Sequence, residues 1–210
     1  MTKPKLKVVA TPKLTADTVL VLAVESEGKK IKPVRTAFSS TLFANATFEA
    51  DFAPVGASSQ AESLTKVQLS SADGTQVLTA LVGTTTKVNP FASFSGGLRE
   101  IGGAISRKLS TSESIVVDLG IETESELLEF IEGLLLGAYD PKTFKSKTSS
   151  YALKNITVVS SAKVSKASLA RAEILATGVH ATRDLTNLPA NHLHPADLAK
   201  CWQSRARARR

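Results

Sequence analysis

The chain has 210 residues, enough for one α/β domain and a short extension. Hydrophobic residues make up 42% and charged residues 21%, values that are ordinary for a folded globular protein and argue against disorder. The single cysteine, Cys201, excludes an internal disulfide framework, and no apolar run approaches the ~18 residues of a membrane span. No apolar signal-peptide stretch follows the basic residues 1–12, so a cytoplasmic protein is expected.

The formal net charge of +7 raises the question of nucleic-acid binding. Four arginines lie within the last six residues, and without them the charge is only +3. The basicity therefore belongs mainly to the tail. Such a tail can touch phosphates, but no basic stretch interleaved with aromatic residues is present, so specific nucleic-acid recognition is not expected.

Runs of Val, Leu, Ile and Thr predict buried strands, and apolar residues at helical spacing predict helices. In chain order we expect a strand at 18–24, a short helix within 36–47, a hairpin with strands at 64–69 and 75–82, a helix at 98–109, a strand at 114–119, a helix from 123 to 139, a strand at 155–160, a helix at 167–185, and a further helix begun at 196–202. Segments 28–33, 54–60 and 187–195 are interpreted as connections.

Local signals support these elements. The Asp73-Gly74 pair allows the positive φ angles of a tight hairpin. Thr123 and Glu126 stand three apart as a capping box at the start of the clearest helix, and Asp140-Pro141 ends that helix. Ser95 or Asn89 could cap the helix before it. Alternating strands and helices predict an α/β fold with a mixed, mainly parallel sheet and helices on both faces.

Two stretches resemble the leucyl aminopeptidase family, the cytosol aminopeptidases. In TRDLTNLPANHLHP, the matching positions are Arg183, Asp184, Leu185, Asn187, Pro189, Asn191 and Pro195. The second stretch is EGLLLGAY at 132–139, followed by Lys142 and Phe144. Residues 98–119 match more loosely, and residues 1–83 match only in general pattern.

The resemblance implies a macrodomain-like N-terminal α/β domain over residues 1–186, with 187–203 as the linker and the start of an unfinished helix. Pro189 stops the long helix and Asn187 can cap it, so the seven motif residues are interpreted as a structural linker rather than a catalytic site. The full-length family is a hexameric peptidase that removes N-terminal amino acids from peptides with two Mn or Zn ions.

The family's metal and catalytic motifs, such as Asp-Ser-Gly-Gly and Asn-Thr-Asp-Ala-Glu-Gly-Arg, do not occur in this sequence. No catalytic and no metal-binding residue is therefore predicted, and the chain alone is expected to be inactive. After Ala199 the family continues as an amphipathic helix, whereas this chain ends in a basic tail at 204–210. The hypothesis is a truncated or frameshifted product in which the catalytic domain is absent.

Other site interpretations are weaker. His192, His194 and Cys201 suggest a metal site but have no fourth ligand, and exposed loop histidines are the simpler interpretation. His180 is expected to be exposed or partly buried rather than catalytic. A carboxylate row of glutamates at positions 122, 126 and 129 fits a solvated helix start.

The glycines at 96–97 and 102–103, after Ser95, could suggest a phosphate-binding loop, but neither G-x-G-x-x-G nor the P-loop pattern is present. A macrodomain-type fold nevertheless leaves a second function open, a stand-alone module that binds ADP-ribose or a related nucleotide.

Overall fold

A computed structural model describes residues 4–61, 63–84, 97–140 and 151–207 of the chain. Its strands are β1 (Lys5–Val9), β2 (Thr18–Glu27), β3 (Lys30–Pro33), β4 (Leu64–Ser70), β5 (Gln76–Gly83), β6 (Ser114–Asp118) and β7 (Asn155–Val159). Its α-helices are α1 (Ala37–Leu42), α2 (Asn45–Glu49), α3 (Gly97–Lys108), α4 (Glu124–Gly137), α5 (Lys166–Thr186) and α6 (Pro195–Arg207). Two 3-10 turns, η1 (Ala53–Val55) and η2 (Ala190–His192), complete the described elements.

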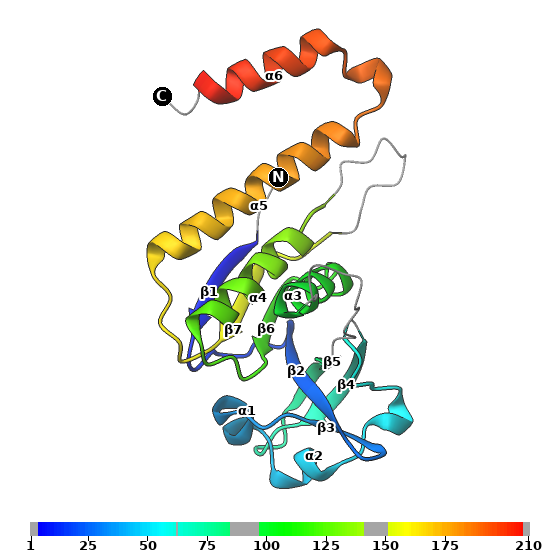
Figure 1. Cartoon of the computed structure of the whole chain (residues 1–210). Helices are drawn as coiled ribbons and strands as arrows, with labels where there is room; N and C mark the ends of the chain where they lie inside the picture. Colours follow the sequence, from blue (N-terminus) through cyan, green and yellow to red (C-terminus); the bar gives the residue numbers. More distant parts are fainter. Residues whose placement is uncertain (1–3, 62, 85–96, 141–150, 208–210) are drawn as a thin grey trace.

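The seven strands form one mixed sheet in the order β1-β7-β6-β2-β5-β4, with β3 paired to β2 (Figure 1). The pairs β1–β7, β7–β6, β6–β2 and β2–β5 are parallel, and β2–β3 and β4–β5 are antiparallel. The prediction of a mixed, mainly parallel sheet is therefore confirmed.

The central strand β2 shows how helices come to cover both faces of this sheet. Val19 and Val21 point into a core formed with α3, α4 and α5, while Leu20 and Leu22 point into a second core with α1 and α2. Successive strand residues face opposite sides, so a strand with helices on both sides must be apolar throughout. The run TVLVLAV meets that requirement, and all seven of its residues are buried.

Two strands were missed. β1 lies in the basic N-terminal segment, for which no strand is predicted, and β3 lies in segment 28–33, for which a connection is predicted. β3 pairs with β2 across a turn at Gly28, whose φ is +65°, and it buries Ile31 between two lysines. Both strands are short and rich in lysine, and β1 pairs with β7 about 150 positions away, so the local sequence carried little signal for either.

The remaining element predictions hold with small shifts. The hairpin at Asp73-Gly74 is confirmed, and Gly74 has φ +86°. The single helix expected within 36–47 is two helices, separated at Phe43, which is buried against the sheet. Thr123 caps α4 by accepting from the Glu126 amide at 3.4 Å, but Glu126 accepts from the Thr123 hydroxyl rather than from its backbone, so the capping box is incomplete. The proposed caps Ser95 and Asn89 lie outside the described residues.

Candidate functional site

The residues of the TRDLTN stretch lie at the end of α5 and face the end of α4. His180, Arg183, Asp184 and Asn187 follow the spacing i, i+3, i+4, i+7, which places four side chains on one face of a helix. The sequence shows this spacing directly. We call these four residues, together with Leu136 and Tyr139 at the end of α4, the helix-end clasp.

Tyr139 is the centre of the clasp. Its hydroxyl donates to Asp184 Oδ1 at 3.1 Å and accepts from Asn187 Nδ2 at 3.0 Å, so both of its hydrogen-bonding functions are used. Its ring lies 5.2 Å from the His180 ring between centroids and 5.4 Å from the Arg183 guanidinium carbon. Burial raises the pKa of the Tyr139 hydroxyl and Asp184 acts in the same direction, although the Asn187 amide opposes them. The phenol therefore remains a donor at neutral pH.

The Leu136 carbonyl is one of the acceptors left without an intrahelical partner at the end of α4. Arg183 Nη1 reaches it at 3.5 Å, and His180 Nε2 lies 3.3 Å from it. His180 is 8% exposed, so it is buried rather than at the surface. The two stretches that carry the family resemblance are more than forty residues apart in the sequence, and they form a single contact between α4 and α5.

The glycines of EGLLLGAY have a different role, which is the close approach of α4 to α3. A Cβ on Gly133 would stand 2.1 Å from the Arg99 carbonyl oxygen, and one on Gly137 would stand 2.4 Å from that of Gly103. Gly102 is equally tight, since its Cβ would meet the Phe130 carbonyl oxygen at 2.6 Å. Of the glycines that could suggest a phosphate-binding loop, Gly102 and Gly103 are therefore helix-packing residues inside α3, and Gly97 is the first residue of that helix. Gly96 and the preceding Ser95 lie outside the described part of the chain.

The other motif residues follow the end of α5. Leu185 is half-buried in its last turn, and Asn187 is its C-cap. Pro189 precedes η2, Asn191 lies within η2, and Pro195 is the first residue of α6. Lys142 and Phe144, quoted with the second stretch, lie outside the described residues. The function of the motif residues as a structural linker remains a prediction.

The alternative metal sites are not assembled in the part of the chain that the structure describes. No group of three or more His, Cys, Asp or Glu side chains there could hold a metal ion. His192 lies in η2, His194 precedes α6, and Cys201 lies two turns into that helix. Of the glutamates, Glu126 is engaged at the start of α4 by Thr123, and Glu129 approaches Gly97.

A cleft that sequence reasoning missed opens at the carboxyl edge of the parallel strands. It has a volume of about 510 Å³ and is lined by residues following β1, β3, β6 and β7, namely 10, 34–38, 40, 118–122 and 159–161. After β2 the chain turns back as β3 and then reaches β4 and β5 on one side of β2. β6, on the other side of β2, leads to β7, so the connections diverge between β2 and β6 and form a topological switch point at this edge. Ligands of open α/β sheets bind at such points. The available signal was Asp118, an acidic residue directly after the buried run IVV.

Asp118 joins the two walls of this cleft. Its carboxylate accepts from the Thr36 hydroxyl and from the backbone N–H groups of Ser39 and Gly120. Only 2% of Asp118 is exposed, and desolvation raises the pKa of its carboxyl despite these three donors. Thr36 also caps α1, because its hydroxyl accepts from the Ser39 amide at 3.0 Å. The contact fixes the β3–α1 connection against the end of β6.

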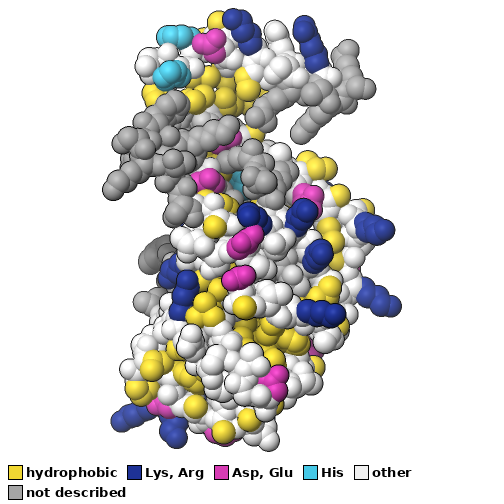
Figure 2. Space-filling view, turned by 180° about the vertical axis from the view of Figure 1, so that it is seen from behind, with side chains coloured by type: hydrophobic (Ala, Val, Ile, Leu, Met, Phe, Trp, Pro, Cys, Tyr) yellow, Lys and Arg dark blue, Asp and Glu magenta, His cyan; other side chains and the backbone are white. Residues whose placement is uncertain are grey.

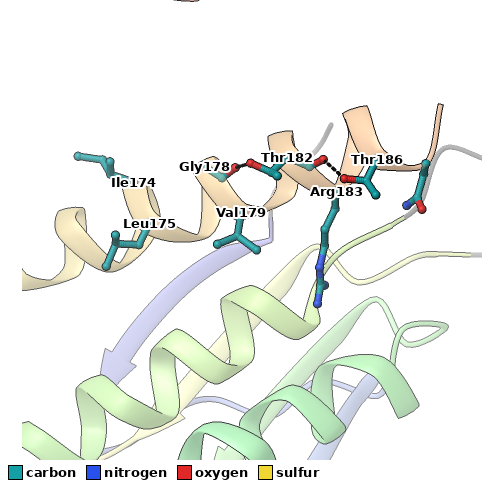
Figure 3. A pocket seen from close by; sticks show the side chains of 8 residues that line it. Ile174, Leu175, Gly178, Val179, Thr182, Arg183 and Thr186 are labelled. Atoms are coloured by element: carbon teal, nitrogen blue, oxygen red, sulfur yellow. Dashed lines mark hydrogen bonds between the residues drawn. The ribbon is translucent and has the colours of Figure 1, made fainter. Parts of the chain in front are cut away.

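A second hollow runs along α5, with a volume of about 580 Å³ (Figure 3). Ile174, Leu175 and Val179 line it, and all three are more than 40% exposed. Figure 3 also shows Arg183 reaching from this helix toward the end of α4.

On the opposite side of the molecule, Lys and Arg side chains are spread among apolar and acidic ones rather than gathered in one patch (Figure 2). Of the described helices, none has the length and apolar character needed to cross a bilayer.

The comparisons with known proteins agree with the two stretches. No family model matches the chain. It is 29% identical over 190 residues to a probable cytosol aminopeptidase of Mycobacterium bovis, covering 87% of this chain and 36% of that protein. It is 35% identical over 107 residues to that of Mycobacterium marinum, covering 49% and 21%. The chain thus spans about a third or less of the length of these relatives.

The fold has a counterpart among solved structures. A mutant of tomato leucine aminopeptidase superimposes with a TM-score of 0.65 at 18% identity, and the match covers 98% of this chain and 43% of that chain. At this identity the likeness concerns the fold, which agrees with an α/β N-terminal domain.

Proposed function

Because the chain belongs to the leucyl aminopeptidase family, we propose that it is the N-terminal, non-catalytic domain of a metal-dependent aminopeptidase. The observation that carries this proposal is the helix-end clasp, in which the two family-type stretches contact each other through Tyr139, Asp184 and Asn187. These residues hold two helices together, and their polar and aromatic groups bind one another across the contact. Peptide hydrolysis would then depend on residues other than those of the clasp.

The further properties of the family are proposals for the whole protein. They are a cytoplasmic location, a two-metal centre with Mn or Zn, peptide substrates, and self-association into a hexamer. In that assembly the domain described here would support the oligomer and border the access to the active sites. A macrodomain-like fold for this domain is part of the same proposal.

Metal binding tests this assignment. Isothermal titration of Mn²⁺ or Zn²⁺ into the purified chain is expected to give no saturable binding of two ions, because the described residues gather no ligand set. The matched control is a full-length relative such as the cytosol aminopeptidase of Mycobacterium bovis, freed of its metal and titrated under the same conditions. Two-ion binding by the chain would overturn the proposal that it is non-catalytic.

The cleft at Asp118 supports a second candidate, a binding module for ADP-ribose or a related nucleotide. Its volume of about 510 Å³ falls within the ~300–1,000 Å³ typical of ligand pockets, and it lies at the switch point of the sheet. The rim offers one cation, Arg35, while Asp118 and Glu122 are acidic, a poor match for a pyrophosphate. This mismatch makes the aminopeptidase-domain function the better supported of the two.

ADP-ribose titration separates the two functions. We expect no heat of binding at millimolar ADP-ribose, because the acidic lining opposes the two phosphates. The control variant Glu122→Gln removes the exposed acidic group at the rim, and so it tests whether that negative charge opposes ADP-ribose binding. Saturable binding by the unmodified chain, weakened when Ser160 at the cleft floor is replaced by a larger residue, would instead establish the binding module.

A further inference from the structure

The clasp engages the point at which the chain leaves the domain. Asn187 is the C-cap of α5, and its backbone N–H donates to the carbonyl oxygens of Arg183 and Leu185. Its side-chain amide donates to the Tyr139 hydroxyl at 3.0 Å. The residue that ends the helix is therefore tied both to its own helix and to α4.

Several hydrogen bonds that follow Asn187 are local. Leu188 donates to Leu185, the His194 backbone donates to the Asp197 carboxylate at 3.2 Å, and Leu198 donates back to His194. In Figure 1, α6 lies beyond α5, on the side away from the sheet. The segment after Asn187 starts from the last turn of α5, so the geometry of that turn sets the direction in which the segment leaves the helix.

We propose that the Tyr139 hydroxyl is a positioning group that fixes the direction in which the chain leaves α5, and with it the placement of α6 relative to the sheet. One hydroxyl bridges Asp184, in the last turn of α5, and Asn187, the cap, so it holds the final turn in a single register. The guanidinium of Arg183 and the ring of His180 pack on the Tyr139 ring from the same helix and hold it in place. This inference does not rest on the proposed function, because it concerns the geometry of the chain itself.

A natural fluorophore on α6 can report the motion of that helix. Trp202 is the only tryptophan of the 210 residues, lies on α6 and is 51% exposed. Its time-resolved fluorescence anisotropy separates tumbling with the whole domain from local motion of α6 on the nanosecond scale.

The experiment compares Tyr139→Phe with Tyr151→Phe. The first removes the bridging hydroxyl and keeps the ring, whereas the Tyr151 hydroxyl is buried without a hydrogen-bond partner among the described residues. Tyr139→Phe is expected to at least double the fraction of Trp202 anisotropy lost to local motion. It should also speed amide exchange at Asn187 and Leu188 about tenfold, with far-UV circular dichroism unchanged. Tyr151→Phe should alter neither quantity.

Asn187→Ala provides an independent variant, because it removes the donor on the other side of the same hydrogen bond. It should reproduce the increase in Trp202 motion. Unchanged anisotropy in both Tyr139→Phe and Asn187→Ala would overturn the proposal. So would an equal increase in Tyr151→Phe, since general loosening rather than the clasp would then explain the motion.

Discussion

Gly133→Ala is expected to lower the free energy of unfolding by about 2–3 kcal/mol, because its new methyl group would overlap the backbone of α3. The built Cβ lies 2.1 Å from the Arg99 carbonyl oxygen, a backbone atom that cannot rotate away, so the two helices must separate. Separation would weaken the packing around Ile101 and Phe130, both almost fully buried. Urea unfolding followed by circular dichroism measures the change.

The matched control is the same substitution at Gly178 in α5, where no atom lies within 4 Å of an added Cβ. Alanine is the better helix former, so Gly178→Ala is expected to raise the free energy of unfolding by about 0.5–1 kcal/mol. The two substitutions should therefore differ in sign. A Gly133→Ala variant as stable as the unmodified chain would contradict the close contact between α3 and α4.

Asp118→Ala is expected to cost about 2–4 kcal/mol of stability, because it removes the buried acceptor of the Thr36 hydroxyl and of the Gly120 backbone N–H, and one of the two acceptors of the Ser39 N–H. Asp118→Asn keeps the size and one acceptor oxygen, so it should cost distinctly less. Thr36→Val removes only the hydroxyl and should cost about 1–2 kcal/mol. Equal stability of Asp118→Ala and the unmodified chain would show that Asp118 does not join the cleft walls.

The pH dependence gives this prediction a sign. The pKa of Asp118 is raised in the folded protein, chiefly by desolvation, so folding favours its protonated form. Its proton-linked contribution to stability is fully present below the ordinary pKa of 3.8 and is lost as the pH rises through the raised value. Asp118→Asn lacks that contribution. The stability difference between this variant and the unmodified chain should therefore change across this range and level off above it.

Much of the fold could be predicted because its signals are local. The apolar run of β2, the Asp73-Gly74 turn and the apolar face of α4 each lie within about ten to fifteen residues. β1 could not be predicted, since its partner β7 is far away in the sequence and its five residues include two lysines. The break between α1 and α2 was also missed, because Phe43 turns inward for tertiary packing rather than for helix periodicity.

In the candidate site, too, local features could be predicted from the sequence and long-range contacts could not. The TRDLTN stretch was recognised, but its partner was not, because the pairing of Tyr139 with Asp184 and Asn187 depends on how α4 and α5 cross. Gly133 and Gly137 belong to the stretch EGLLLGAY, which is recognised from the sequence. Glycine is needed at these positions because α4 lies very close to α3, and no sequence pattern indicates that closeness. The cleft at Asp118 combines residues that follow four strands, so it exists only once the sheet is formed.

Hydrolysis of leucine p-nitroanilide by the purified chain with added Mn²⁺ tests most directly the claim that these residues form a domain without chemistry of its own. A full-length cytosol aminopeptidase assayed in parallel shows that the conditions support turnover. We predict no metal-dependent turnover above the rate of the buffer. Turnover that requires Mn²⁺, and that disappears when the metal is chelated, would contradict the account.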